Sequence, residues 1–260
     1  MDLLHLEKAI TLRDSGHLSM AEEEFRQLLV SANDPGDKTS ILHNLAECYR
    51  EMGQIEKAWG CIREARRIAP QTEILLYQEN QEALLLCEDR QFREALDKLE
   101  RFWKEHHAAL ERPEHRTLYE AVQLKRGVLL AEFGRDSEAR PILEQALGFE
   151  LPTEAQHDVA FNLGACYLDA GEFARAKEMF IAALKHRGEG PYAIRAHYNL
   201  GIICLRDQAF AQAIHEFEQC EPNMTEANLS PDFVYGWLAK AWRALGDDEK
   251  AKHFEKLAKF

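Results

Sequence analysis

Few side chains in this sequence are spaced so that they could do chemistry together. Three of the eleven histidines lie near one another, His106, His107 and His115, and imidazole is a common metal ligand. Adjacent histidines on a helix point in different directions, and Pro113 interrupts the segment before His115. The spacing therefore predicts no metal site. No His-Glu-x-x-His, nucleophile-elbow or Walker sequence occurs either.

One segment, residues 188–193, formally fits a dinucleotide-binding fingerprint because it reads Gly-Glu-Gly-Pro-Tyr-Ala. That motif cradles phosphate when it follows a strand and opens a helix. Here it follows a predicted helix and includes Pro191, so we interpret it as a turn between repeats. No cofactor is expected from this sequence.

The cysteines do not form a metal-binding or redox pattern. No two of the six are spaced as Cys-x-x-Cys, and all fall within apolar helical stretches. We interpret them as small buried thiols in a reducing compartment. They are Cys48, Cys61, Cys87, Cys166, Cys204 and Cys220.

Charge and hydropathy exclude several partner classes. Acids outnumber bases 45 to 32, which gives a formal net charge of −13. Duplex binding and anionic membrane binding both need an excess of lysine and arginine, so neither nucleic acid nor a membrane surface is an expected partner. Residues 1–8 do not read as a signal peptide, and no apolar run of about 18 residues occurs. We therefore expect a cytoplasmic protein.

Internal repetition is the strongest signal in the chain. A turn position recurs at intervals of 37, 37, 44, 37, 37 and 38 residues, and these seven units fill the chain. The long interval contains a polar stretch around Pro113. The turn positions are Gly16, Gly53, Arg90, Gly134, Gly171, Gln208 and Gly246.

Each unit is predicted to be a pair of helices. Apolar residues recur three or four apart on both sides of the turn, and alternating strand patterns are absent. Small residues stand where the two helices should cross, as in Ala46 against Ala58, Gly164 against Ala176 and Gly201 against Ala213. One pair cannot bury its own apolar face, so successive pairs must stack.

This pattern resembles the tetratricopeptide repeat (TPR) family across residues 2–260. The second unit matches the family signature with Leu42, Leu45, Ala46, Tyr49, Gly53, Ala58 and Pro70. The fifth matches it with Leu163, Gly164, Tyr167, Gly171, Ala176, Phe180 and Ala183. Departures occur in the third unit, at Arg90, Glu79 and Glu82, and in the fourth, at Asp136 and Pro141.

The resemblance implies an all-α fold, a right-handed superhelical solenoid of about seven TPR-like antiparallel helix pairs. We expect a single domain over residues 1–260. Its predicted repeats cover about 2–38, 39–75, 76–119 (with a longer connection), 120–156, 157–193, 194–231 and 232–260.

In the family, fixed positions of each first helix line a concave groove. The matching positions of this sequence predict a C-terminal groove lined by aromatic and apolar residues, with amide and cationic side chains interspersed among them. Asn44, Asn162 and Asn199 share a repeat position that often touches ligand backbone in the family, or asparagine is simply common there. The aromatic row could bind ligand or pack between first helices. The candidate partner-binding residues are Lys125, Phe161, Asn162, Arg195, Tyr198, Asn199, Ile202, Trp237, Lys240 and Arg243.

The N-terminal groove differs, because its matching positions are mainly acidic and are interpreted as a solvated face. They are Glu7, Asp14, Glu47, Glu51 and Glu88. The lysine–asparagine clamp with which some members hold acidic chaperone tails does not transfer, since its positions in the first unit are Leu6 and Ile10.

These observations favour a protein–protein interaction scaffold, an adaptor or chaperone-like protein that binds a partner's peptide or helix in its groove. An enzyme is not expected, because the repeats occupy the whole chain. The alternative is self-assembly, a homodimer formed through the stripe Leu3, Leu6 and Ile10 of the first helix. A catalytic site within the groove would need a polar constellation that no spacing here indicates.

Overall fold

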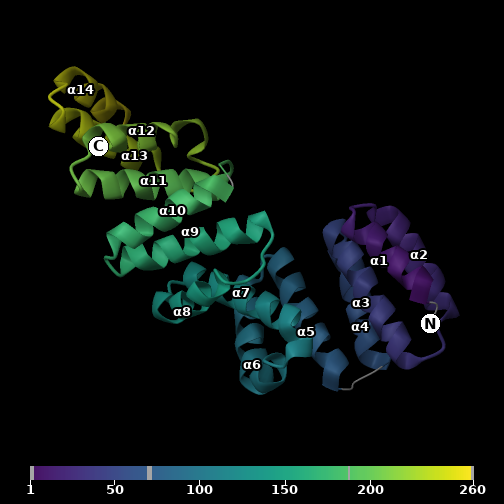
Figure 1. The fold of residues 1–260 in the computed structure, drawn as a ribbon. Coiled ribbons are helices and arrows are strands. Elements are labelled where there is room, and N and C mark those ends of the chain that lie inside the picture. The colour runs from purple at the N-terminus through teal and green to yellow at the C-terminus, as the bar shows by residue number, and fades with distance from the viewer. Residues whose placement is uncertain (1–2, 69–71, 187, 259–260) are drawn as a thin grey trace. The chain divides into compact units, whose positions relative to one another are not determined.

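The computed structural model describes residues 3–68, 72–186 and 188–258. Within these ranges the chain forms fourteen α-helices and no strand, and it is 82% helical (Figure 1). The predicted all-α fold is confirmed. Pro70, the closing proline of the second unit's signature, lies outside the described residues.

Two compact units make up the chain, and their boundary falls within α7. Unit 1 is Met1–Val122 and unit 2 is Gln123–Phe260. The single continuous domain expected from the repeats stays a prediction.

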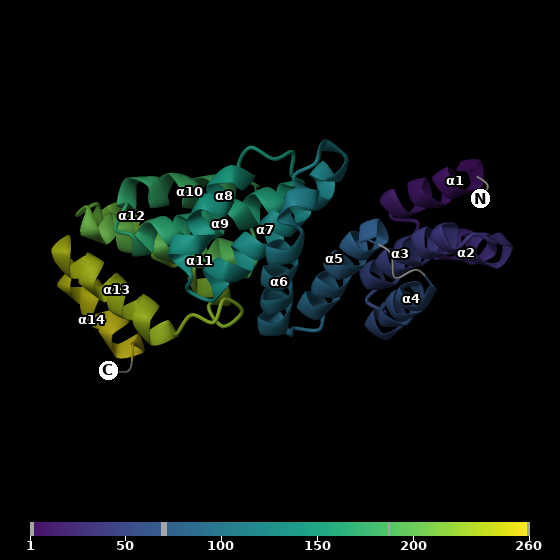
Figure 2. The same cartoon turned by 90° about the horizontal axis from the view of Figure 1, so that it is seen from below.

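Unit 1 contains α1 to α6 and the start of α7 (Figure 2). Their bounds are α1 Leu3–Asp14, α2 Leu18–Ser31, α3 Pro35–Glu51, α4 Ile55–Ile68, α5 Thr72–Glu88, α6 Phe92–Leu110, the 3-10 helix η1 Pro113–His115, and α7 Arg116–Glu132. Within it, α1 packs on α2, α3 on α4 and α5 on α6.

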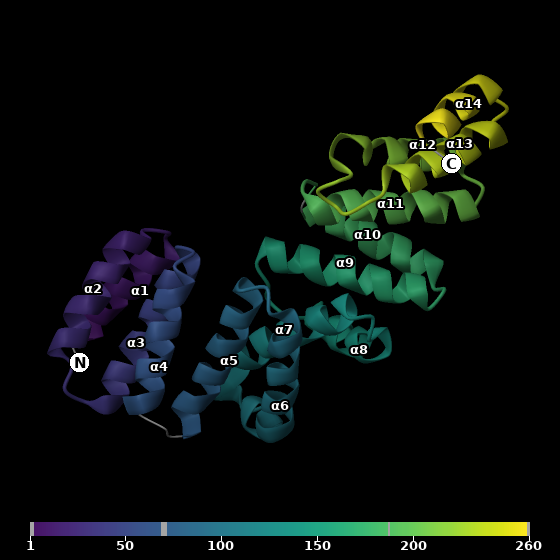
Figure 3. The ribbon, with the colours of Figure 1, turned by 180° about the vertical axis from the view of Figure 1, so that it is seen from behind.

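Unit 2 continues with further pairs, and Figure 3 shows their order along the chain. Its elements are α8 Asp136–Ala146, α9 Thr153–Asp169, α10 Phe173–His186, α11 Pro191–Arg206, α12 Phe210–Glu218, the 3-10 helix η2 Glu221–Asn223, α13 Pro231–Ala244 and α14 Asp248–Leu257. Each pair also packs on the next, α10 on α11 and α12 on α13.

All seven predicted turn positions adopt a left-handed backbone conformation. Five are glycines with φ between 68° and 83°, while Arg90 and Gln208 both have φ of 59°. Each ends a first helix with the same two hydrogen bonds. At the first turn, the Gly16 N–H donates to the Arg13 carbonyl and the His17 N–H to the Leu12 carbonyl. This is the Schellman motif, which ends a helix and reverses the chain.

Close approach of the two helices explains the small residues at the crossings. A methyl group built on Gly164 would lie 2.9 Å from the Phe180 ring, and one on Gly201 would lie 2.6 Å from the Phe217 ring. Both distances are shorter than van der Waals contact. The same holds for Gly127 of α7, where the methyl would meet Leu143 of α8 at 3.0 Å.

The two acidic residues that depart from the family pattern in the third unit both have partners, although Glu82 is buried and Glu79 partly buried. Glu79 and Glu82 of α5 both pair with Lys98 of α6, and both also pair with Arg66 of α4. The Lys98–Glu82 distance is 2.6 Å. These charges therefore link three helices.

The crossing at Gly201 can be tested with a matched glycine. We expect Gly201→Ala to destabilise the protein by about 1–3 kcal/mol through overpacking against Phe217. A methyl on Gly60 of α4 would meet nothing within 4 Å, so Gly60→Ala should instead stabilise by about 0.5–1 kcal/mol. Urea unfolding measures both, and equal shifts in midpoint would refute the crossing geometry.

The left-handed turn at Gln208 gives a second test. We expect Gln208→Gly to stabilise the protein by about 0.5–1 kcal/mol, because a side chain at positive φ is strained. The control is Gln212→Gly, an exposed position within α12, which should destabilise by a similar amount. A thermal midpoint that falls in both variants would contradict the first expectation.

Candidate functional site

Three of the predicted residues in unit 2 form one aromatic and cationic surface. The Trp237 indole N–H of α13 donates to the Tyr198 hydroxyl of α11 over 3.3 Å. Lys240 Nζ lies 5.1 Å from the centre of the Trp237 ring. Tyr198 and Trp237 are partly exposed and Lys240 is exposed. We call Tyr198, Trp237 and Lys240 the aromatic surface.

Phe161 does not belong to that surface, although the repeat position predicted an anchor there. Only 2% of Phe161 is exposed, because its ring packs against Phe180 at 5.8 Å and Tyr192 at 5.0 Å. Arg195 lies over the same ring, 5.2 Å from its centre. Phe161 is therefore a core residue. Arg195 is exposed, and its guanidinium covers the Phe161 ring.

The asparagines do not form the expected row of solvated amides. Asn162 is only 4% exposed, and its amide donates to the Asp158 carbonyl one turn earlier in the same helix. Asn199 and Ile202 of α11 are partly exposed. The expectation of solvation is therefore wrong at Asn162, which is buried and hydrogen-bonded within its own helix.

Lys125 lies near a cluster of polar residues that was not predicted from the sequence. Burial raises the pKa of the Asp158 carboxyl, while His157 and Lys125 oppose this shift. Nearby, the Tyr192 hydroxyl donates to Glu132 over 2.7 Å. Tyr192 follows the Gly-Glu-Gly-Pro segment, which the sequence marked only as a turn, so no repeat position indicated its role.

The last predicted cations line a cavity of about 700 Å³ at the C-terminal end of unit 2. Arg243 is paired there with Glu255 of α14 at 2.6 Å, whereas Lys240 has no acidic partner within the described residues. The lining residues are Gly236, Ala239, Lys240, Arg243, Ala244, Glu255 and Ala258.

Unit 1 contains a second cavity, of about 730 Å³, which the sequence did not predict. The first helices α1, α3 and α5 line it together with η1. We call it the N-terminal pocket. Its lining residues are Arg13, Gly36, Ser40, His43, Asn44, Glu47, Tyr77, Gln81, Glu114 and His115.

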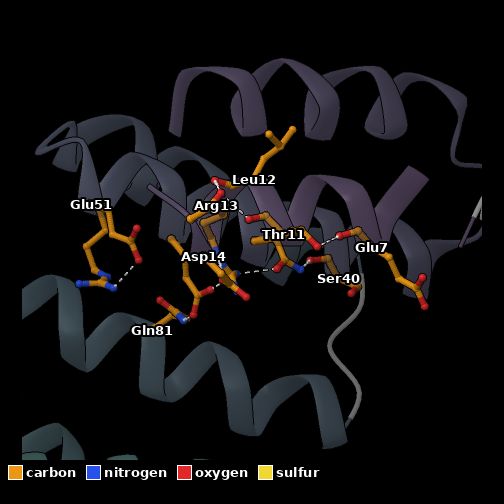
Figure 4. A network of polar contacts seen from close by, with 12 residues as sticks. Glu7, Thr11, Leu12, Arg13, Asp14, Ser40, Glu51 and Gln81 are labelled. Carbon is orange, nitrogen blue, oxygen red and sulfur yellow. Dashed lines mark hydrogen bonds and ion pairs between the residues drawn. The ribbon is translucent and has the colours of Figure 1, made fainter. Parts of the chain in front are cut away.

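A polar network centred on Arg13 joins the walls of this pocket (Figure 4). Arg13 donates to Asp14, to the Asn44 side-chain oxygen over 2.7 Å and to Glu47. Gln81 of α5 donates to the other oxygen of Glu47 over 2.7 Å. Burial alone would lower the pKa of the Arg13 guanidinium, but Glu47 and Asp14 outweigh it and raise that pKa.

The predicted solvated acidic face therefore needs correction. Asp14 and Glu47 are paired with Arg13, while Glu51 and Glu88 lie 3.6 Å and 3.5 Å from Arg50. Glu7 is exposed, as expected. The pairing of these acids with arginines could not be predicted from the repeat pattern. Arg13 and Arg50 belong to the last turns of first helices, where the pattern assigns no fixed residue type.

The thiols and histidines do not form a chemical centre in the part of the chain that is described. All six cysteines are free, and burial raises the pKa of the Cys61 thiol to about 11 and that of Cys48 to about 12, so neither is a reactive thiolate. No group of metal-binding side chains is found among these residues. His106 and His107 instead lie against Phe102 and Trp103.

Family models for the tetratricopeptide repeat match residues 39–72 and 155–226. The chain is a tetratricopeptide repeat protein. Proteins of this family are in general protein–protein interaction scaffolds and are typically not enzymes. No helix among the described residues combines the length and hydrophobicity needed to cross a membrane.

Solved structures share the TPR fold at low sequence identity. PilF of Pseudomonas aeruginosa matches with a TM-score of 0.58 at 17% identity, over 85% of this chain and 90% of its own. The apo form of the quorum sensor NprR from B. thuringiensis matches at 0.57 and 13%, over 98% and 85%. A TPR protein from Parabacteroides merdae matches at 0.52 and 17%, over 98% and 91%.

One curated relative is the human cilia- and flagella-associated protein 70. It is 28% identical over 131 residues, which cover 48% of this chain and 11% of the relative. The TPR chain described here thus spans a small part of that relative's length.

Acid should weaken the TPR fold partly through His43 in the N-terminal pocket. Burial lowers the pKa of its imidazole to about 4, against about 6.5 when unfolded. Between these values the unfolded chain binds more protons, so stability falls as pH drops from about 6.5 to about 4.

We expect the urea midpoint of His43→Gln to fall less than that of the parent protein when the pH is lowered from about 7.5 to about 5. His107→Gln removes an exposed imidazole and should keep the parental loss. If both variants lose as much as the parent, His43 is not the source of the acid sensitivity.

Proposed function

We propose that this TPR protein is a cytoplasmic adaptor or chaperone-like scaffold that binds a peptide or helix of a partner protein on the first helices of unit 2. The observation that carries the proposal is the aromatic surface. Trp237 and Tyr198 come from first helices of successive repeats and are joined by a hydrogen bond while both stay partly exposed.

Such a pair suits recognition because the indole orientation is already fixed before a ligand arrives. Tryptophan and tyrosine are common anchors in protein interfaces, where a few residues contribute most of the affinity. Pre-ordered side chains lose less conformational entropy on binding. Asn199 follows Tyr198 on α11 and can both donate to and accept from a peptide backbone.

The cations around the aromatic surface favour a ligand that carries acidic side chains. Lys240 contributes most to this preference, since Arg243 already pairs with Glu255. Lys125 and Arg195 extend the positive charge along α7 and α11. Phe161 and Asn162 are left out of the direct contacts because both are buried.

Self-assembly is a second candidate, favoured by the exposure of the first helix. Leu6 and Ile10 pack against the core of unit 1, so the predicted stripe is not free as a whole. Leu3 and Leu4, however, are 67% and 80% exposed. These two leucines are the surface that a second copy would cover.

The proposal is tested with a charge reversal at Lys240. Lys240→Glu should reduce recovery of the partner from native lysate about tenfold, because it places a carboxylate beside the tryptophan anchor. Lys185→Glu makes the same change at an exposed position of α10, a second helix, and should leave recovery unchanged. Quantitative mass spectrometry compares both variants with the parent.

Equal recovery with Lys240→Glu and the parent would contradict the proposal. Trp237→Ala is a second variant, although it also removes a contact with the core of unit 2. Light scattering of the same samples over a concentration series separates the two candidates. A mass that doubles with concentration, with no partner lost in either variant, would favour self-assembly instead.

A further inference from the structure

The N-terminal pocket of unit 1 has no part in the function proposed above. It is lined by first helices of three successive repeats and by η1. Its volume of about 730 Å³ is within the range of about 300–1,000 Å³ typical of sites for drug-sized ligands. The pocket can therefore hold more than one amino-acid side chain.

Arg13 cannot serve as an anion receptor in this pocket. Four donor contacts already engage its guanidinium: two with Asp14, one with Asn44 and one with Glu47. A guanidinium has five N–H groups, so about one remains. Glu47 is equally occupied, because Arg13 takes one carboxylate oxygen and Gln81 the other.

The groups left open favour a cation. Glu114 is exposed, and no partner for its carboxylate is found among the described residues. Tyr77 is 44% exposed and lines the pocket, and the face of a tyrosine ring attracts ammonium and guanidinium groups. His115 lies beside Tyr77, with 6.4 Å between the ring centres; it is only 7% exposed and its Nδ1 has no hydrogen-bond partner.

The surface around the pocket is also negatively charged, which favours a cation as well. Arg13 and Arg50 are shared among four carboxylates, those of Asp14, Glu47, Glu51 and Glu88, so these pairs keep a net negative charge. Glu7 and Glu114 are exposed and add to that charge. Charge of one sign around a concave site raises the local concentration of oppositely charged ligands. An acidic ligand would be repelled here.

We propose that the N-terminal pocket binds an arginine or lysine side chain of an extended basic segment of a partner protein. The cation lies between the Tyr77 ring and the Glu114 carboxylate, and the flanking residues of the segment follow α1, α3 and α5. This recognition is opposite in charge to that of the aromatic surface and does not depend on it.

The test uses the full chain and three fluorescein-labelled peptides of equal length, tetra-arginine, tetra-citrulline and tetra-glutamate. Citrulline keeps the shape of arginine and removes its charge. Fluorescence anisotropy at about 0.15 M salt, where exposed charges beyond about 8 Å are screened, measures the dissociation constants. We expect tetra-arginine to bind at least about tenfold more tightly than tetra-citrulline and tetra-glutamate not to bind.

Two variants with the same charge change distinguish the pocket from general attraction to an acidic protein. Glu114→Lys should weaken tetra-arginine binding about tenfold, since the reversed charge lies in the pocket. Glu64→Lys alters an exposed site on α4, the second helix of its repeat. This variant should change the affinity for tetra-arginine less than about twofold. Tyr77→Leu keeps an apolar side chain, removes the ring face, and should weaken binding about fivefold.

Equal losses in Glu114→Lys and Glu64→Lys would overturn the proposal in favour of non-specific charge attraction. Competition by free arginine amide at the concentration of the peptide would overturn the assignment to a chain segment. Lys240→Glu, the variant that tests the aromatic surface of unit 2, should not lower the affinity for tetra-arginine. The two proposals can therefore fail separately.

Discussion

The whole architecture depends on how closely the two helices of each repeat approach. At Gly201 and Gly164 the helix backbone lies directly against the ring of a phenylalanine on the paired helix, with no room for a methyl group. That contact fixes the distance and register of the pair. Because one pair leaves an apolar face open, the same register then determines how the next pair stacks and which first-helix side chains stay exposed.

A second position adjusts this packing from repeat to repeat. Residues 19 apart face each other across the helix pair as His5 with Glu24, Glu79 with Lys98, and His197 with Glu216. In the last repeat the equivalent pair is Tyr235 with Phe254, whose rings stack at 6.0 Å. At three of these positions a side chain contacts a carboxylate across the pair, so replacing one partner alone would leave the other polar group without its hydrogen bond.

The features that could be predicted from the sequence are local. The seven turns were found because a left-handed C-cap needs a fixed spacing, and the spacing holds even where Arg90 and Gln208 replace glycine. The crossing glycines were found because small residues recur at one repeat position, although the sequence paired them with Ala176 and Ala213 and not with the rings of Phe180 and Phe217 that lie nearest. Neither inference requires knowledge of how one repeat meets the next.

Exposure along the groove could not be predicted in the same way. Phe161 and Asn162 occupy first-helix positions that face ligand in the family, yet both are buried, Phe161 beneath the ring of Tyr192 from the next repeat. The N-terminal pocket was missed because it needs Gln81 of the third unit to meet Glu47 of the second. Such contacts depend on side-chain size and charge in two repeats at once.

Charge divides the first-helix surfaces of the two units more sharply than their shared repeat pattern implies. In unit 1 the arginines are already held by Asp14, Glu47 and Glu88, so the surplus charge there is negative. In unit 2 Lys240 is exposed beside Trp237 and has no acidic partner among the described residues, so the aromatic surface carries a free positive charge. Stacking constrains the small and apolar positions of a repeat and leaves the solvent-facing ones free to vary. One repeated fold can therefore present two surfaces that select ligands of opposite charge, without any change in the contacts that hold the helix pairs together.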